Sequence, residues 1–218
     1  MFSLAFDTTV NFCSIALFKD VEKIDIFEQE MDFGQAETLI VKIDEILKRN
    51  SLTFKDLSLI TVCTGPGSFT GVRSSVSAAR AFKLACPDVC VTGVNAFEAY
   101  AEDISPDELS EVNAVIIETK REDFYVQYYD KTLKKIIPPS TAFYDDIISF
   151  LSSKRVTLTG DGVERFLSRP SGLSLHSIKI KQKTDIEKLA LAGIKRYINK
   201  TTDFPKPLYL KAPDVCIK

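Results

Sequence analysis

The chain has 218 residues, of which 45% are hydrophobic and 27% are charged, and its formal net charge is −2. This composition is typical of a globular protein with one large domain or two small ones, and it excludes a strongly basic surface that could grip a phosphodiester backbone unaided. No apolar run approaches the roughly 18 residues that a membrane-spanning helix needs, and the sequence enters its first apolar run without a basic leader, so we expect a cytoplasmic protein with no membrane partner.

The first part of the chain begins with three predicted strands and a helix. Short apolar or alternating runs predict the strands at residues 2–6, 12–18 and 23–27. From Gln35 onward the apolar residues recur at helical spacing, which predicts a helix. Asp32 with Gln35 resembles a capping box at its start.

A glycine-rich loop follows. It lies between a buried strand predicted at residues 57–63 and a second helix predicted from the apolar stripe at residues 72–82. A fifth strand is predicted at residues 89–94. Gly65, Gly67 and Gly71 lie in this loop, where backbone N–H groups at a helix N-terminus attract anions. The loop is not a P-loop, because the required lysine is absent, and its glycine spacing also fails the dinucleotide-binding pattern.

Two interpretations of the loop stay open. The first is a phosphate or nucleotide site, because an acidic residue with hydroxyl neighbours ends the first strand, and such residues coordinate magnesium and phosphate in actin-like ATP-binding folds. The residues of this candidate site are Asp7, Thr8, Thr9, Gly65, Pro66, Gly67, Ser68, Thr70, Gly71 and Arg73. The second is structural, with glycines for positive φ, a proline that fixes the turn, and Ser68 or Thr70 as the helix cap. Arg73 could contact phosphate, a partner carboxylate or the carbonyl end of a helix.

A weaker version of the same element order follows. Strands are predicted at residues 113–117, 124–129, 133–137 and 156–159, and helices at residues 143–151 and 186–197. The repetition predicts two α/β lobes, residues 1–101 and 102–218, with a last segment that can pack back on the first lobe. The join is expected in the acidic stretch 102–111, and the alternative is one domain with a long surface loop.

Metal and nucleophile chemistry have little support in the sequence. The five cysteines are an odd number, and Cys13 and Cys63 lie inside apolar runs, so no disulfide framework is predicted. Cys86 and Cys90 form a C-x3-C pair, but the single histidine, His176, is distant, so we expect no metal site and interpret His176 as a loop or surface residue. The turn that opens the second lobe begins at Glu118 and continues with Thr119, Lys120 and Arg121; its basic residues would tolerate a phosphate but would not hold magnesium.

Several motifs spread over nearly the whole chain occur together in one known family. The segment GPGSFTGVR follows a T-x-C-T strand, and the first strand ends in DTT and is followed by CSIAL. Further motifs are GVNAFEA at 93–99, the ETKREDFYVQ hairpin, LTGDG at 158–162 and PLYLKAPDV at 207–215. On these motifs the sequence closely resembles the TsaB (YeaZ) family, and the combination of GPGSFTGVR with PLYLKAPD is specific, although each fragment alone would be weak.

The resemblance implies a fold and a function. The fold is a two-lobe actin-like, Hsp70-like α/β fold (ASKHA, RNase H-like), each lobe a mixed sheet with flanking helices. The function is that of a non-catalytic subunit in forming threonylcarbamoyladenosine beside the anticodon of tRNAs. Such a subunit binds and activates the related TsaD, and it is TsaD that carries the metal and the transferase site. The subunit also helps to recruit the ATPase TsaE, and it contacts tRNA only indirectly. The alternative is a self-sufficient ATPase or kinase that uses Asp7, Thr8 and the glycine loop.

The resemblance also implies cofactors and a binding surface. No cofactor is expected to bind tightly to this chain alone, whereas ATP or ADP and magnesium belong to the full complex. Family members have a histidine before Ala-Glu at the start of the first long helix, where this chain has Gln35, which argues against a metallopeptidase. The first helix and the helix after the glycine loop are expected to build a four-helix bundle with TsaD, as a heterodimer, or with a second copy.

The residues expected at that interface are Leu39, Ile43, Val72, Ser75, Val76 and Ala79. The alternative is that these positions face their own sheet, as most apolar helix stripes do. A group of basic residues in the second lobe is expected either to face tRNA or to form a solvated edge. Its members are Lys120, Arg121, Lys131, Lys134 and Lys135.

Overall fold

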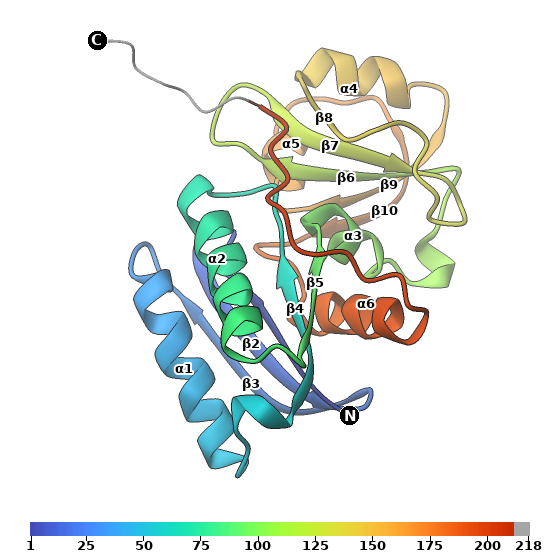
Figure 1. Cartoon of the computed structure of the whole chain (residues 1–218). Coiled ribbons are helices and arrows are strands. Elements are labelled where there is room, and N and C mark those ends of the chain that lie inside the picture. The colour runs from blue at the N-terminus through green and yellow to red at the C-terminus, as the bar shows by residue number, and fades with distance from the viewer. Residues whose placement is uncertain (212–218) are drawn as a thin grey trace. The chain divides into compact units, whose positions relative to one another are not determined.

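The structure is a computed structural model in which residues 1–211 are described, and the chain divides into two compact units (Figure 1). Unit 1 contains Met1–Asp103 together with Lys183–Pro207, and unit 2 contains Ile104–Gln182 and, at the end of the described residues, 208–211. Residues 183–207 thus group with unit 1, whereas the sequence counted them with the second lobe and expected only that its last segment can pack back on the first. The end of the PLYLKAPDV motif and Cys216 lie outside the described residues.

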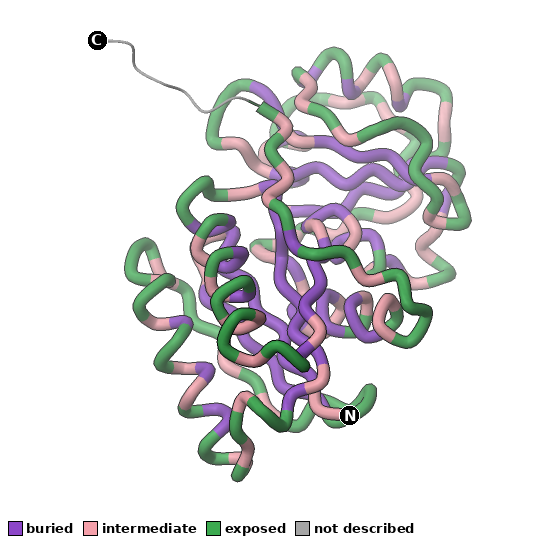
Figure 2. The backbone as a smooth tube through the Cα atoms, in the orientation of Figure 1, coloured by how far each residue is buried: buried purple, intermediate pink, exposed green. Residues whose placement is uncertain are grey.

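The sheet of unit 1 has five strands in the order β3-β2-β1-β4-β5. Its strands are β1 (Phe2–Asp7), β2 (Phe12–Lys19), β3 (Glu22–Glu30), β4 (Leu57–Cys63) and β5 (Cys90–Val94). The first three pair antiparallel, whereas β4 and β5 are parallel to β1. The five strands expected from the apolar runs are confirmed, and the central ones are buried because both of their faces are covered (Figure 2).

Four helices belong to unit 1, namely α1 (Gln35–Arg49), α2 (Phe69–Ala85), α3 (Ala96–Ala101) and α6 (Ile186–Ile198), with a 3-10 turn η1 (Phe54–Asp56). Helices α1 and α2 cover the sheet face that carries Leu4 and Phe6, where Leu39, Ile43 and Ala79 complete an apolar core. Helix α6 covers the opposite face, where Gly193 lies against Thr61 of β4. The long apolar stripes thus become sheet-facing sides of helices.

The capping box expected at the start of α1 is wrong. The helix begins after Gly34, which adopts a left-handed conformation with φ of 85°, and no side chain caps it. The turn at Gly34 directs Asp32 toward Asn11, whose Nδ2 donates to Asp32 Oδ1 at 3.4 Å. Gln35 Nε2 donates instead to the carbonyl of Met31 at 2.7 Å.

Unit 2 repeats the topology of unit 1. Its strands are β6 (Val112–Glu118), β7 (Phe124–Tyr129), β8 (Ser140–Ala142), β9 (Arg155–Gly160) and β10 (Ser174–Ile180), in the order β10-β9-β6-β7-β8. Strands β6, β7 and β8 form an antiparallel meander, and β9 and β10 are parallel to β6. The apolar face packs on α4 (Tyr144–Leu151) and α5 (Val163–Leu167), and a 3-10 turn η2 (Pro106–Glu108) precedes β6.

Two expectations for unit 2 are corrected. Residues 133–137 form a turn with a single bridge, Tyr129 to Lys135, because Asp130 Oδ1 accepts from the amides of Thr132 and Lys134, and Leu133 has a φ of 58°. The third strand is β8 instead. His176 lies within the edge strand β10, where its Nε2 is 3.0 Å from the carbonyl oxygen of Asp107, so of the expected loop or surface position only the loop is wrong.

Across residues 1–211, none of the helices combines the length and the apolar character required to cross a bilayer.

Candidate functional site

The glycine loop lies against the turn that follows β1. The amide of Ser68 donates to the carbonyl of Thr9 at 2.6 Å, and Thr8 Oγ1 donates to the carbonyl of Gly71 at 2.8 Å. The amide of Thr8 donates to Ser75 Oγ at 3.1 Å. The structure thus brings together the two sequence segments that were expected to form one site.

Close approach of two backbones explains two of the glycines. A Cβ atom on Gly67 would lie 2.3 Å from the carbonyl oxygen of Thr9, and one on Gly71 would lie 1.9 Å from that of Thr8. Gly65 has a φ of 87°, which favours glycine. The structural interpretation of the loop therefore accounts for all three glycines, because two of them allow close backbone contact and the third adopts a positive φ.

The cap of α2 and the position of Arg73 are also resolved. Ser68 is the N-cap residue, and its Oγ accepts from the amide of Gly71 at 3.4 Å, whereas the carbonyl of Thr70 accepts from Ser74 Oγ. The guanidinium of Arg73 lies over the ring of Phe69, 3.7 Å from its centroid, in a cation–π contact at the exposed start of the helix.

Asp7 is a buried carboxylate that accepts hydrogen bonds from the chain's own donors. It is 3% exposed, its Oδ1 accepts from the amide of Thr9 at 2.7 Å, and its Oδ2 accepts from Thr184 Oγ1 at 2.5 Å. Burial, with a smaller contribution from the charge of Asp7, raises the pKa of the Cys13 thiol to about 12, and the same causes raise that of Cys63. Both thiols are therefore held in the neutral form, which is a poor nucleophile.

A magnesium-bound nucleotide, which actin-like folds commonly hold, does not fit these residues as they are arranged. Asp7 turns both oxygens toward protein donors, and the main chain of Thr8 and Thr9 lies against Gly67 and Gly71. Among the described residues, no three histidine, cysteine, aspartate or glutamate side chains are grouped so that they could hold a metal ion.

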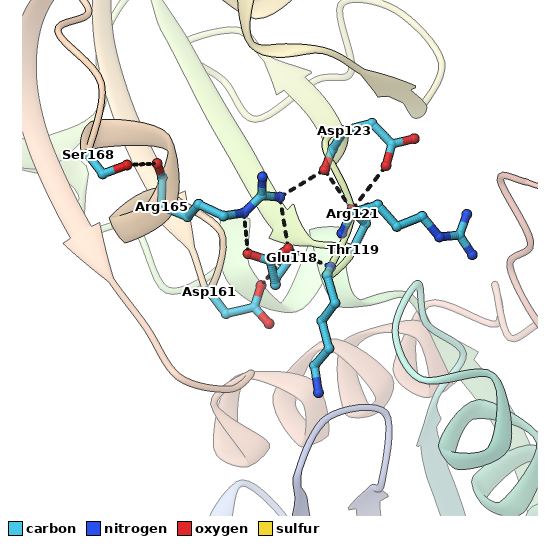
Figure 3. A network of polar contacts seen from close by, with 8 residues as sticks. Glu118, Thr119, Arg121, Asp123, Asp161, Arg165 and Ser168 are labelled. Carbon is cyan, nitrogen blue, oxygen red and sulfur yellow. Dashed lines mark hydrogen bonds and ion pairs between the residues drawn. The ribbon is translucent and has the colours of Figure 1, made fainter.

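Unit 2 has a corresponding site at the end of β6, where Glu118 forms an ion pair (Figure 3). Arg165 Nε donates to Glu118 Oε2 at 2.6 Å, and Arg165 Nη2 donates to Oε1 at 2.8 Å and to the carbonyl of Asp123 at 2.8 Å. The guanidinium also lies 3.7 Å from the ring centroid of Phe124. This two-point contact neutralises the carboxylate at the same place in the topology that Asp7 has in unit 1.

The GDG turn after β9 packs on β6 as the glycine loop packs on β1. A Cβ on Gly160, which has a φ of 123°, would lie 2.2 Å from the carbonyl oxygen of Ile116, and the amide of Gly162 donates to that oxygen at 3.0 Å. Asp161 Oδ1 accepts from the amide of Glu118 at 3.0 Å (Figure 3). Both units therefore use a glycine-bearing turn to hold the end of their first strand.

The basic residues of unit 2 do not form one group. Thr119 Oγ1 donates to the carbonyl of Asp123 at 2.6 Å and accepts from the amide of Arg121, which shapes the turn between β6 and β7 (Figure 3). Lys120 and Arg121 lie in this turn, and the three remaining lysines follow the far end of β7. A six-residue strand spans about 20 Å, so the expected cluster is divided.

The six residues expected at a partner interface are buried within unit 1. Their exposed fractions do not exceed 3%, and the members are Leu39, Ile43, Val72, Ser75, Val76 and Ala79. Leu39, Ile43 and Ala79 belong to the apolar core that packs on the sheet, and Ser75 Oγ lies 2.7 Å from Thr8 Oγ1, which favours the alternative interpretation of the stripe. The large apolar side chains exposed on or beside the two helices are Phe33, Ile40, Val41, Phe69 and Leu84.

Two residues that shape these sites had no recognisable signal in the sequence. Thr184 reaches Asp7 from a segment 177 positions away, and Arg165 reaches Glu118 from 47 positions away. The helix signal at residue 186 could have directed attention to Thr184 as a neighbour of its start, but nothing local identifies its partner.

Comparisons with known proteins agree with one another. A family model described as TsaD: tRNA N6-adenosine threonylcarbamoyltransferase matches residues 34–216. The tRNA threonylcarbamoyladenosine biosynthesis protein TsaB of Buchnera aphidicola subsp. Baizongia pistaciae (strain Bp) is 30% identical over 171 residues, which cover 75% of this chain and 76% of that protein.

Two solved structures are also similar. YeaZ from Pseudomonas aeruginosa has a TM-score of 0.80 at 18% identity and covers 96% of this chain and 99% of its own. The activator of the 2-hydroxyisocaproyl-CoA dehydratase from Clostridium difficile, with bound ADPNP, has a TM-score of 0.52 at 11% identity and covers 92% and 97%. The expected two-lobe actin-like fold is thereby confirmed.

Proposed function

The chain belongs to the TsaB (YeaZ) family, and from this membership we propose that it is a non-catalytic subunit of the machinery that forms threonylcarbamoyladenosine in tRNA. The observation that carries the proposal is the match to a curated TsaB over three quarters of the chain, together with a family model that matches residues 34–216. The relative's name identifies the modified nucleoside, and the model's description names the transferase to which the chain is related.

The non-catalytic part of the proposal is supported by what the polar residues contact. Asp7 and Glu118 end the first strands of their units, and both accept hydrogen bonds from protein donors. Burial raises the pKa values of Cys13 and Cys63. These groups hold the fold together, so the bond-making chemistry is assigned to another subunit.

The partner we propose is TsaD, with TsaE joining the complex and the isolated chain able to pair with itself through the same helices. The proposed surface is the exposed side of α1, where Ile40 is 45% and Val41 is 55% exposed, next to Phe33, which is 89% exposed. Apolar side chains that are exposed on neighbouring turns are typical of a protein–protein contact.

Co-expression with TsaD followed by size-exclusion chromatography tests the surface. We expect the wild-type chain to co-elute with TsaD, and Ile40→Glu to elute alone with an unchanged melting temperature, because a charge would be buried in the contact. Leu191→Glu on α6, where Leu191 is 36% exposed, is the matched control and is expected to co-elute. A charge at Val76 would not serve, because that side chain is 3% exposed and the substitution would unfold α2.

Two outcomes would contradict this proposal. Co-elution of I40E as efficiently as wild type would move the surface away from α1. Failure of the wild-type chain to co-elute would remove TsaD as the partner. Separately, calorimetry of the isolated chain with ATP and magnesium is expected to show no binding, and tight binding with turnover would favour the self-sufficient ATPase or kinase instead.

A further inference from the structure

The chain re-enters unit 1 at Lys183, and its first residues there are fastened to the ends of strands. Lys183 Nζ donates to the carboxylate of Glu28, and Thr184 Oγ1 donates to Asp7 Oδ2 at 2.5 Å. Asp185 then caps α6, because its Oδ1 accepts amide hydrogens from the first turn. Thr184 is 2% exposed and Asp7 is 3% exposed, so their hydrogen bond is shielded from water.

The other oxygen of the Asp7 carboxylate is connected to α2 through hydrogen bonds of the Thr8–Thr9 turn. Asp7 Oδ1 accepts from the amide of Thr9, and the carbonyl of Thr9 accepts from the amide of Ser68, the N-cap residue of α2. Thr8 is held by Ser75 of α2, since their hydroxyl oxygens are 2.7 Å apart. The turn of Thr8 and Thr9 is therefore bound to Asp7 on one side and to the first two turns of α2 on the other.

We propose that Asp7 is a positioning residue, whose carboxylate couples the return of the chain at Thr184 to the start of α2. A buried carboxylate is stable only while donors satisfy it, and each donor is strengthened by the charge of the acceptor. Loss of the Thr184 donor leaves the Asp7 carboxylate with one fewer hydrogen-bond partner. The Thr8–Thr9 turn, which is bound to the same carboxylate, is then held less firmly. An acidic residue at the end of the first strand is thus used to set the position of a helix.

The coupling has a consequence for partner binding that rests on the proposed function. Helix α2 packs beside α1, on which the TsaD surface is placed. A loosened start of α2 is therefore expected to weaken binding of TsaD. The structural part of the inference does not depend on TsaD, so the two parts are tested separately.

Hydrogen exchange of single amides in the full chain tests the structural part. Thr184→Val keeps the shape of the side chain and removes the donor, and we expect the amides of Thr8, Thr9 and Ser68 to exchange about tenfold faster. Thr184→Ser restores the hydroxyl and is expected to return exchange close to wild type. The matched control is Thr92→Val, since Thr92 is fully buried and its hydroxyl has no hydrogen-bond partner within the described residues; it is expected to change nothing.

Faster exchange confined to residues 183–187, with the amides of Thr8, Thr9 and Ser68 as in wild type, would overturn the coupling. If T184V does not fold, native-state exchange of the wild-type chain in a urea series replaces it. The amides of Thr9, Ser68 and Glu187 are then expected to open with one shared free energy, and three separate values would overturn the proposal. Normal binding of TsaD to a T184V chain whose turn has loosened would reject only the consequence for the partner.

Discussion

At the scale of single residues, the glycine loop shows how a missing Cβ can serve the chain itself. Gly71 allows the first turn of α2 to lie on the carbonyl of Thr8, and Gly67 does the same for Thr9. The hydrogen bonds from Ser68 and Thr8 across this contact depend on the short separation. The loop is therefore a packing joint between β1 and α2.

Gly71→Ala is expected to destabilise the chain by about 3 kcal/mol, because the new methyl group would overlap the backbone oxygen of Thr8 and force the joint apart. Urea denaturation at neutral pH measures the loss. Gly172→Ala is the control, since Gly172 has a φ of 60° and nothing lies within 4 Å of its added Cβ. Its cost is expected to be about 1 kcal/mol, from backbone conformation alone. Equal costs for the two variants would contradict the role given to close approach.

Glu108 provides a prediction for the dependence of stability on pH. Lys179 Nζ donates to Glu108 Oε2 at 2.8 Å and Ser105 donates from its amide at 2.9 Å, and these bonds lower the pKa of Glu108 from its ordinary 4.5 to about 2. Because the pKa is lowered in the folded state, the stabilisation is complete above pH 4.5 and is lost as the pH falls toward 2.

Glu108→Gln is therefore expected to lower stability by about 1 kcal/mol at neutral pH and to flatten the fall in stability between about pH 4.5 and pH 2. Urea midpoints of wild type and E108Q measured across this range provide the test. An acid-induced loss that is equally steep in E108Q would show that other carboxylates are responsible.

The chemistry of the candidate site could be predicted from the sequence only in part. The pattern placed Asp7 and the glycine loop together correctly, because parallel strands end at the same edge of a sheet. It could not decide between phosphate and packing, since both require glycines at the start of a helix. The decisive contacts come from Thr184 and Arg165, which are distant in sequence and carry no local signature.

At the scale of elements, the two faces of the unit 1 sheet differ in side-chain size. The face under α1 and α2 carries large apolar residues such as Leu4, Phe6 and Ile15, whereas the alternate residues Ser3, Ala5, Ser14, Ala16 and Thr61 face α6. Small side chains allow α6 to approach closely, and Gly193 is the point of closest contact. The sheet thus specifies which helix covers which face.

Gly193→Ala tests this close packing, because intrinsic helix propensity and packing predict opposite signs. Propensity alone would stabilise the helix by about 1 kcal/mol, but the Cβ would lie 1.9 Å from Thr61 Oγ1, so we expect a net loss of about 2 kcal/mol. Thermal unfolding measures the difference, with Lys195→Ala on the exposed side of α6 as a control that stays within about 0.5 kcal/mol of wild type. A more stable G193A chain would show that α6 can move away from the sheet at little cost.

The elements that the sequence predicted well are those with a clear apolar period. The strands at 57–63 and 124–129 and the helix that begins at 186 were found because each buries a continuous or regularly spaced set of side chains. Strand β10 was missed because it lies at a sheet edge, where its serines, histidine and lysine interrupt the pattern. Helices α3 and α5 have six and five residues, too few to display a period.

At the scale of the whole molecule, the sequence predicted the repeated strand order and a last segment that can pack back on the first lobe, but it did not show that residues 183–207 are members of unit 1. That membership depends on distant contacts, such as the hydrogen bonds from Arg80 to the carbonyl of Pro205, at 3.1 and 2.8 Å, and the ion pair of Arg196 with Glu98. Each unit also holds the acidic residue at the end of its first strand with a donor from a later segment. The two units therefore share a strand topology, and in each unit a hydrogen bond from a later segment stabilises the acidic residue at the end of the first strand.

The proposed role predicts a measurable change in tRNA. In cells depleted of this protein, mass spectrometry of tRNA nucleosides is expected to show a loss of threonylcarbamoyladenosine, since a subunit that activates the transferase limits its product. Re-expression of the wild-type chain or of Thr92→Val is expected to restore the nucleoside, whereas Ile40→Glu is expected not to, because it cannot engage TsaD. Normal levels after depletion would contradict the role itself. Full restoration by I40E would leave the role intact and show that the binding surface lies elsewhere on the chain.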